Sequence, residues 1–297
     1  MKIDVTKLRG RRAVDRWNRV SMGDLFERVK WGAPQREVLR SGEGAYESEE
    51  NASLTAHRAD ELANRYANAI RARGVNEGQV VMLICENSAE AILAKIGLAK
   101  AAVTVAPVNP NLSDDVLAEL IALCAPAGLV ADSDFLARAE QLAKTHSIEL
   151  LHQIRITPTE SSVPSFAEFI EHACSEEPEV EIHGDDIWEL LFTSGSTSVP
   201  KAAMVSHANT MFAALSFNGV GMIGLEYESD FVMCSFLPII YHVGDALIYN
   251  AVLSGGKAVI GRRLNPRLIA EAIDAQKISC LWGGAPQAVD AIAAEFE

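Results

Sequence analysis

A run of small hydroxylic residues that ends in a lysine is the stretch of this sequence best suited to binding an anion. It follows an apolar segment at 190–192 and reads Thr193, Ser194, Gly195, Ser196, Thr197, Ser198, Val199, Pro200 and Lys201. Small residues let a backbone turn tightly, so that its N–H groups converge on one anion. The hydroxyls add donors and the lysine adds a full positive charge. The run therefore predicts a loop that cradles phosphate groups, placed between a strand and a helix.

Two familiar loops of similar composition do not fit this run. A Walker A loop needs a second glycine and a Ser or Thr after its lysine, but here Ala202 follows Lys201. A nucleophile elbow needs Gly-x-Ser-x-Gly, which the run lacks. Composition alone also suits a polar surface turn, so the order of the residues has to decide.

That order, Thr-Ser-Gly-Ser-Thr followed after two residues by Pro-Lys, resembles the phosphate-binding loop of the adenylate-forming superfamily. The superfamily contains acyl-CoA synthetases, luciferases and the adenylation domains of peptide synthetases. The resemblance continues in Val-Ser-His-Ala-Asn at 205–209, in the segment at 78–88 that ends in Glu-Asn-Ser, and in Ala-Pro-Val-Asn-Pro at 106–110. Together these segments cover the chain from about residue 50 onward.

A lone histidine is the second candidate. Leu237 and Pro238, followed by His242, Val243 and Gly244, resemble a family element whose histidine lines the carboxylate and acyl-adenylate site. The alternative is a histidine satisfied by the local backbone. Asp245 lies close enough in sequence to orient it. Neither this pair nor Ser206 with His207 makes a convincing nucleophile–base triad.

A glycine-rich segment and two tryptophans are further candidates for lining a pocket. The Gly-Gly-Ala-Pro segment at 283–286 is expected to be pocket wall at most, because it comes too early to be the family's nucleotide-contacting element. Trp188 and Trp282 either line an acyl pocket or pack in the core, and core packing is favoured.

The resemblance implies an acyl-CoA synthetase. Such an enzyme activates a carboxylic acid with ATP to an acyl-adenylate and then forms a thioester with CoA. Thr193, Ser194, Gly195, Ser196, Thr197, Ser198 and Lys201 would bind the ATP phosphates, and His242 would contact the acyl-adenylate. Mg²⁺ would bind through the phosphates, with no metal ligand assigned to the protein.

The chain departs from the family pattern in two ways. Ser198 and Ala202 stand where glycine is usual, and either change weakens the expected ATP binding. The family's Tyr-Gly-x-Thr-Glu segment, ribose-binding aspartate, hinge and C-terminal lid domain do not occur before Glu297. We therefore expect residues 1–297 to be an incomplete large N-terminal domain, inactive in the full reaction when alone. Alternatives are a half-reaction enzyme that uses preformed acyl-adenylate, an enzyme that loads a carrier protein, and a non-catalytic scaffold.

The elements expected around these residues alternate between strand and helix. Helices are expected at 54–73, 87–100, 113–124, 135–144, 208–216, 243–253, 266–276 and 287–296, and strands at 79–84, 103–108, 128–131, 231–236, 257–260 and 278–282. This alternation predicts an α/β fold with mainly parallel sheets. The family resemblance implies stacked αβ layers, with subdomains at roughly 71–224 and at 1–70 plus 225–297.

Composition narrows the partners. The chain has 297 residues, 49% of them hydrophobic and 22% charged, which indicates a globular protein and not a disordered one. A net charge of −14 argues against a nucleic-acid partner. No apolar segment is free enough of charge to predict a membrane span or a signal peptide. The five cysteines are scattered, so we expect a reducing cytoplasm. The resemblance also allows a homodimer.

Overall fold

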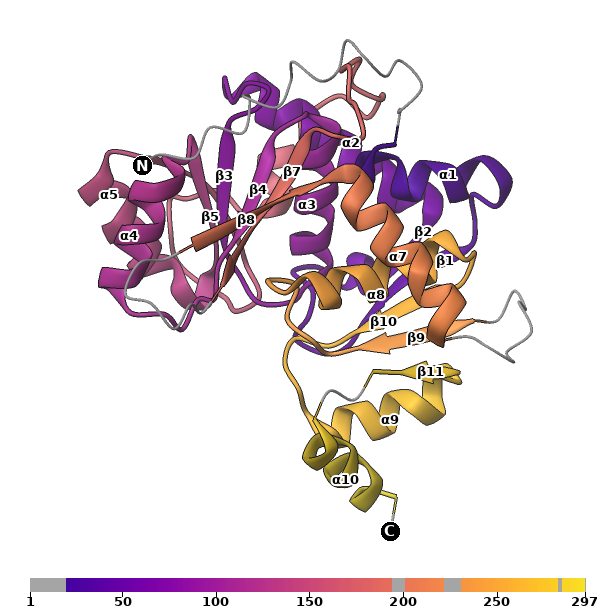
Figure 1. Cartoon of the computed structure of the whole chain (residues 1–297). Helices are drawn as coiled ribbons and strands as arrows, with labels where there is room; N and C mark the ends of the chain where they lie inside the picture. Colours follow the sequence, from indigo (N-terminus) through magenta and orange to yellow (C-terminus); the bar gives the residue numbers. More distant parts are fainter. Residues whose placement is uncertain (1–19, 194–200, 222–230, 283–284, 297) are drawn as a thin grey trace. The chain divides into compact units, whose positions relative to one another are not determined.

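The structure, a computed structural model, describes residues 20–193, 201–221, 231–282 and 285–296. They divide into two compact units (Figure 1). Unit 1 holds the described residues up to Gly23 together with Glu61–Cys85 and Leu93–Thr210. Unit 2 holds Asp24–Asp60, Glu86–Ile92 and the described residues from Met211 onward. The predicted subdomains, 71–224 and 1–70 with 225–297, stay a prediction, and the compact units are divided at other residues.

Unit 1 contains a six-stranded sheet in the order β6-β5-β3-β4-β7-β8. Its strands are β3 (Val80–Ile84), β4 (Thr104–Pro107), β5 (Gly128–Asp132), β6 (Glu149–Ile154), β7 (Ile187–Thr193) and β8 (Lys201–Ser206). All neighbours are parallel except β7 and β8, which are antiparallel. Continuous apolar runs form the central strands because parallel strands are covered on both faces, and every residue of β3 is buried.

Helices α4 (Asp114–Cys124), α5 (Leu136–His146) and α6 (Phe166–Ile170) belong to unit 1, as does most of α2 (Ala56–Ala72). Apolar side chains of α4 and α5 share one core cluster with those of β3, β4 and β5. Ser113 occupies the N-cap position of α4, but its side chain accepts no capping hydrogen bond. Asp114 and Asp115 lie in the first turn, where their negative charges stabilise the positive end of the helix dipole.

Unit 2 contains a five-stranded sheet in the order β11-β9-β10-β1-β2. Its strands are β1 (Glu37–Ser41), β2 (Ser53–Thr55), β9 (Val232–Ser235), β10 (Lys257–Ile260) and β11 (Cys280–Leu281). Only the β1–β2 pair is antiparallel among them. The predicted α/β class with mainly parallel sheets is therefore confirmed in both units.

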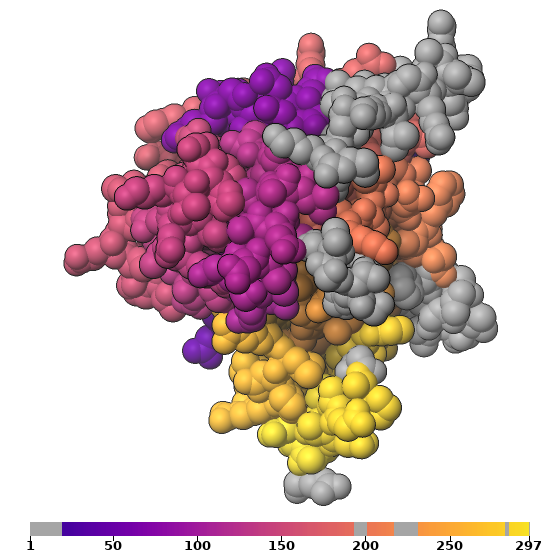
Figure 2. Space-filling view, turned by 60° about the vertical axis from the view of Figure 1, so that its left-hand side comes forward, coloured from indigo at the N-terminus to yellow at the C-terminus, as the bar shows by residue number. Residues whose placement is uncertain are grey.

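Helices α1 (Leu25–Gly32), α8 (His242–Leu253), α9 (Pro266–Gln276) and α10 (Pro286–Ala294) belong to unit 2. Helix α9 begins where its sequence predicts, because the Asn265 side chain accepts a hydrogen bond from the Leu268 N–H and Pro266 opens the first turn. Helices α9 and α10 lie together at the yellow end of the chain in Figures 1 and 2. Their apolar side chains meet those of β9 and β10 in a second core cluster.

Helix α3 (Ala89–Lys100) begins in unit 2, where its buried Glu90 accepts a hydrogen bond from the Asn51 Nδ2 at 2.8 Å. Burial raises the pKa of Glu90 from 4.5 to about 7, although the Asn51 hydrogen bond opposes the rise. The nearby Glu47 carboxylate also favours the protonated form. Folding therefore favours a protonated Glu90.

Because the pKa of Glu90 is higher in the folded chain than in the unfolded chain, the free energy of unfolding depends on pH. In the unfolded chain Glu90 loses its proton near pH 4.5, whereas the folded chain keeps it until about pH 7. Its contribution is thus complete below pH 4.5 and is lost as pH rises through 7. At about 1.4 kcal/mol per pKa unit, protonated Glu90 contributes up to about 3 kcal/mol to the free energy of unfolding.

We expect Glu90→Gln to remove this component of the pH dependence, because glutamine stays neutral and still accepts from Asn51. Urea unfolding of the wild type and of Glu90→Gln at several pH values from 4 to 8 measures it. The variant should gain stability relative to wild type as pH rises. A constant difference between the two proteins across that range would contradict the assignment.

Candidate functional site

The predicted phosphate loop connects two antiparallel strands of unit 1. The Cα of Thr193, the last residue of β7, pairs with the Cα of Lys201, the first residue of β8. Our prediction of a loop between a strand and a helix is therefore wrong, because β8 intervenes and α7 (His207–Gly221) begins only after it. Lys201 is exposed at the end of the loop. Ser194, Gly195, Ser196, Thr197 and Ser198 lie outside the described residues.

Strand β7 is held in unit 1 by two buried polar contacts just before the loop. The Lys95 Nζ of α3 lies 2.6 Å from the Glu189 Oε1, and both side chains are fully buried. The Trp188 Nε1 donates to the Thr210 Oγ1 at 2.8 Å. The Lys95 ammonium also lies 5.5 Å from the centre of a Trp188 ring. Core packing of Trp188 is thus confirmed, and β7 has a fixed position relative to its neighbours.

The far side of the loop is fixed by the start of α7. The Ser206 Oγ accepts from the Asn209 N–H while the Asn209 Oδ1 accepts from the Ser206 N–H, both at 3.2 Å. This reciprocal pair caps the helix. His207 is buried, and its Nδ1 accepts from the Met22 N–H at 3.0 Å. Its ring stacks on Trp188. The segment at 205–209 therefore fixes the exit of the loop, and His207 has a structural role.

His242 is the first residue of α8 in unit 2 and is partly buried. The turn before it is closed by a hydrogen bond of 3.0 Å from the Tyr241 N–H to the Pro238 carbonyl. Gly244 packs against the same carbonyl, since a Cβ at this position would lie 2.6 Å from the Pro238 oxygen. Asp245, one turn along the helix, is buried. The Pro238, His242 and Gly244 pattern therefore describes a tight turn into a helix.

The comparisons with known proteins decide the family. The family model described as AMP-binding enzyme matches residues 10–297. The chain belongs to the AMP-binding enzyme family. This confirms the predicted resemblance, and the matched residues include the loop and the His242 turn.

Individual proteins resemble this chain in sequence or in fold. A medium/long-chain-fatty-acid–CoA ligase, FadD6 of Mycobacterium tuberculosis, is 25% identical over 241 residues, which are 80% of this chain and 37% of the relative. A long-chain-fatty-acid–CoA ligase from Archaeoglobus fulgidus, FadD1, superimposes with a TM-score of 0.81 at 21% identity, over 93% of this chain and 54% of the other. ATP-bound MatB from Rhodopseudomonas palustris gives 0.76 at 20% identity, over 91% and 50%. This AMP-binding enzyme chain thus spans 37% of the length of the curated relative.

Lys201 and Thr193 belong to unit 1 and His242 to unit 2, so a common role for them in this AMP-binding enzyme chain stays a prediction. Trp282 was expected in the core, but its side chain is 45% exposed because β11 ends at Leu281 on the edge of its sheet. Gly283 and Gly284 of the suggested pocket wall lie outside the described residues.

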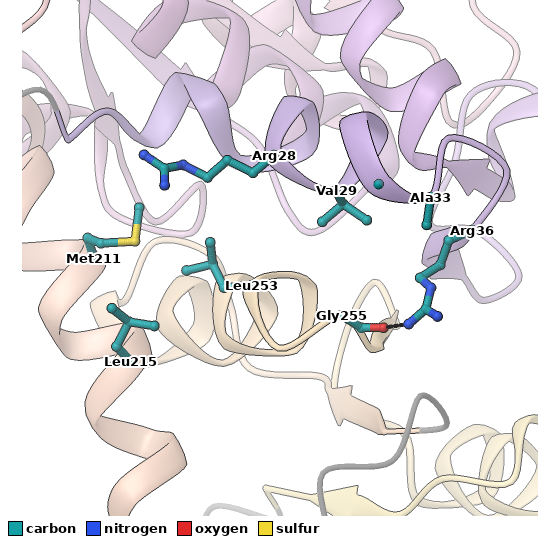
Figure 3. A pocket seen from close by; sticks show the side chains of 9 residues that line it. Arg28, Val29, Ala33, Arg36, Met211, Leu215, Leu253 and Gly255 are labelled. Atoms are coloured by element: carbon teal, nitrogen blue, oxygen red, sulfur yellow. Dashed lines mark hydrogen bonds between the residues drawn. The ribbon is translucent and has the colours of Figure 1, made fainter.

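The sequence did not indicate an open groove of about 430 Å³ in unit 2 (Figure 3). Apolar side chains from α1, α7 and α8 line it, among them Val29, Met211, Leu215 and Leu253. Arg36 donates to the Gly255 carbonyl, and the Arg28 guanidinium lies 3.5 Å from the Asp24 carboxylate. Of the predicted site residues that the structure describes, none lines the groove.

Among the residues whose side chains are described, no cluster of three histidine, cysteine or acidic side chains could hold a metal ion. No helix within the described ranges has the length and apolar character needed to cross a membrane.

Proposed function

We propose that this chain carries the phosphate-binding and acid-binding parts of an AMP-forming acid–CoA ligase. The observation that supports it most is the Thr193–Lys201 run itself, placed where two paired strands end and Lys201 is exposed. MatB, one of the similar structures, is described as ATP-bound, and FadD6 and FadD1 are described as CoA ligases. Their names suggest ATP and CoA as the co-substrates of this chain as well.

The proposed first step joins the carboxylic acid to AMP. A carboxylate oxygen forms a bond to the α-phosphorus of ATP while the bond from that phosphorus to pyrophosphate breaks. Negative charge grows on the leaving pyrophosphate, where backbone N–H groups, hydroxyls and Lys201 of the loop would stabilise it. Mg²⁺ bound to the phosphates would share that charge. His242 would contact the acyl-adenylate.

The proposed second step transfers the acyl group. The CoA sulfur forms a bond to the acyl carbonyl carbon, AMP leaves with the bonding electrons, and the thiol proton is lost. The thioester forms because AMP is a far better leaving group than the oxide of a free carboxylate. The loop is not needed for this step, since no pyrophosphate leaves in it.

That difference bears on the second candidate function, an enzyme that makes only the thioester from a preformed acyl-adenylate. Ser198 and Ala202 favour it, because both replace a glycine where a backbone would approach phosphate closely. Such replacements weaken the first step and leave the second untouched.

The experiment follows the two steps separately on the full product of the gene that encodes this chain. Acyl-CoA formation is measured once from acid, ATP and CoA, and once from synthetic acyl-adenylate and CoA. The ligase predicts product in both assays. Product from acyl-adenylate alone would favour the half-reaction, and product in neither assay would contradict the proposed function.

A further inference from the structure

Asn87 lies buried between the carboxyl ends of two neighbouring strands of unit 2. Its Nδ2 donates to the Leu237 carbonyl at 2.9 Å, just after β9, and to the Gly261 carbonyl at 3.1 Å, just after β10. Its Oδ1 accepts from the Ile239 N–H at 2.9 Å. One amide side chain thus uses donors and acceptor on main-chain groups of two strand ends.

These bonds do not cap the helix that follows. Capping of α3 is done by Ser88, whose Oγ accepts from the Ala91 N–H at 3.0 Å. Asparagine and serine are both common N-cap residues, and the structure separates the roles of Asn87 and Ser88. A residue next to a helix start with its side chain turned to two distant strand ends is a tether and not a cap.

Neighbouring groups hold the second strand end at the same place. The Glu86 carboxylate lies 3.0 Å from the Arg262 Nε and 2.5 Å from the Arg263 Nε. Gly261 leaves no room for a Cβ, because the Phe236 ring fills that space. The end of β10 is therefore fixed, so the Asn87 bonds transfer that fixed position to the segment after β9.

That segment leads directly to His242. Asn87 binds Leu237 and Ile239 on either side of Pro238, and the Pro238 carbonyl closes the turn to Tyr241 and contacts Gly244. These contacts all involve residues 237–244, which lead into and form the first turn of α8. A shift of Leu237 or Ile239 would therefore displace His242.

We infer that Asn87 is a positioning residue that sets the place of His242 in the acid-binding part of the site. This inference rests on the proposed function for the role of His242, but the tether itself is independent of it. Replacing the amide by a carboxylate brings oxygen against the Leu237 and Gly261 carbonyls, which repel it.

The test compares Asn87→Asp with Asn64→Asp. Asn64 is a matched control because it is a buried asparagine that donates to the Ser175 carbonyl at 3.1 Å and belongs to unit 1, whereas His242 belongs to unit 2. Histidine-selective NMR of the folded chain reports the His242 imidazole, assigned by its loss in His242→Gln. We expect Asn87→Asp to shift or broaden this signal and Asn64→Asp to leave it unchanged.

Kinetics of the full gene product give a second readout. We expect Asn87→Asp to raise the KM for the acid about ten-fold, the effect of one lost hydrogen bond of about 1.4 kcal/mol, with the KM for ATP unchanged. An unmoved His242 signal in folded Asn87→Asp would overturn the inference. A moved signal in a protein that activates no acid would uphold the tether and reject the proposed function.

Hydrogen exchange on the wild type covers the case in which Asn87→Asp does not fold. The Ile239 amide should exchange slowly because it is buried and bonded to the Asn87 Oδ1. Fast exchange of Ile239 beside slow exchange in β9 would overturn the tether without any variant.

Discussion

Lys201→Ala is expected to lower the rate of acid adenylation about 10²–10³-fold in the full gene product, the usual effect of removing one preorganised electrostatic contact. Lys201 is exposed and ends the predicted phosphate loop opposite Thr193. Its replacement by alanine therefore removes the positive charge that would stabilise the ATP phosphates. Packing should not suffer, because an exposed strand-end side chain is replaced by a smaller one. We also expect saturable ATP binding to this chain to be abolished by the same change.

The controls separate charge from structure. Lys144→Ala removes an exposed lysine of α5 in the same unit and should leave both ATP binding and adenylation unchanged. Lys201→Arg keeps the charge and should retain part of the binding, although arginine presents it in a different geometry. Unchanged ATP affinity in Lys201→Ala would contradict the role given to the loop.

Lys95→Met is expected to destabilise the chain by about 3–5 kcal/mol, because it leaves the Glu189 carboxylate buried without this ammonium partner. Lys95 and Glu189 are both fully buried and 2.6 Å apart. Methionine has a similar length and fills most of the space of the lysine stem. The loss should therefore come from the uncompensated charge and not from a cavity.

Urea unfolding of three variants beside the wild type measures this effect. Lys95→Met alone should lose most, whereas Lys95→Met with Glu189→Gln should recover much of the loss, because no buried charge remains. Lys277→Ala is the surface control, since its pair with Asp274 at 3.1 Å is more than four-fifths exposed on both sides. A double variant no more stable than Lys95→Met alone would contradict the charge explanation.

The sequence predicted the elements whose burial follows a regular pattern. The strand expected at 79–84 is β3, a run with every side chain buried, and the helix expected at 266–276 is α9, marked by Asn265 and Pro266. The phosphate-binding role of the loop and the acyl-adenylate contact of His242, for which periodicity carries no signal, stay predictions. The regular elements follow local sequence patterns, so the sequence alone is enough to predict them.

Strands β6 and β8 were missed because their side chains do not look like those of a buried strand. Strand β6 contains His152 and Gln153, both buried. Burial lowers the pKa of His152 to about 4, and its Nε2 lies 2.9 Å from the Tyr66 hydroxyl oxygen. Strand β8 has no alternating apolar pattern and forms by pairing with β7. The partner of His152 in β6 lies 86 positions away in the sequence, whereas β8 depends on pairing with the strand just before it.

The same limit applies to Asn87. Its three partners follow it by 150, 152 and 174 positions. A dipeptide Asn-Ser before an apolar helix predicts a cap from local chemistry, and only the fold brings the ends of β9 and β10 to the asparagine. Lys95 and Glu189 are similar, because charged residues in a sequence are expected at the surface until their pairing is known.

Acid-dependent exchange of labelled pyrophosphate into ATP tests the central claim most directly, because it isolates the adenylation step. The full gene product is incubated with ATP, Mg²⁺, labelled pyrophosphate and each member of a panel of aliphatic and aromatic carboxylic acids. The account predicts exchange that needs an acid and falls about 10²–10³-fold in Lys201→Ala. Absence of exchange with every acid, in a folded protein that also shows no saturable ATP binding, would contradict it.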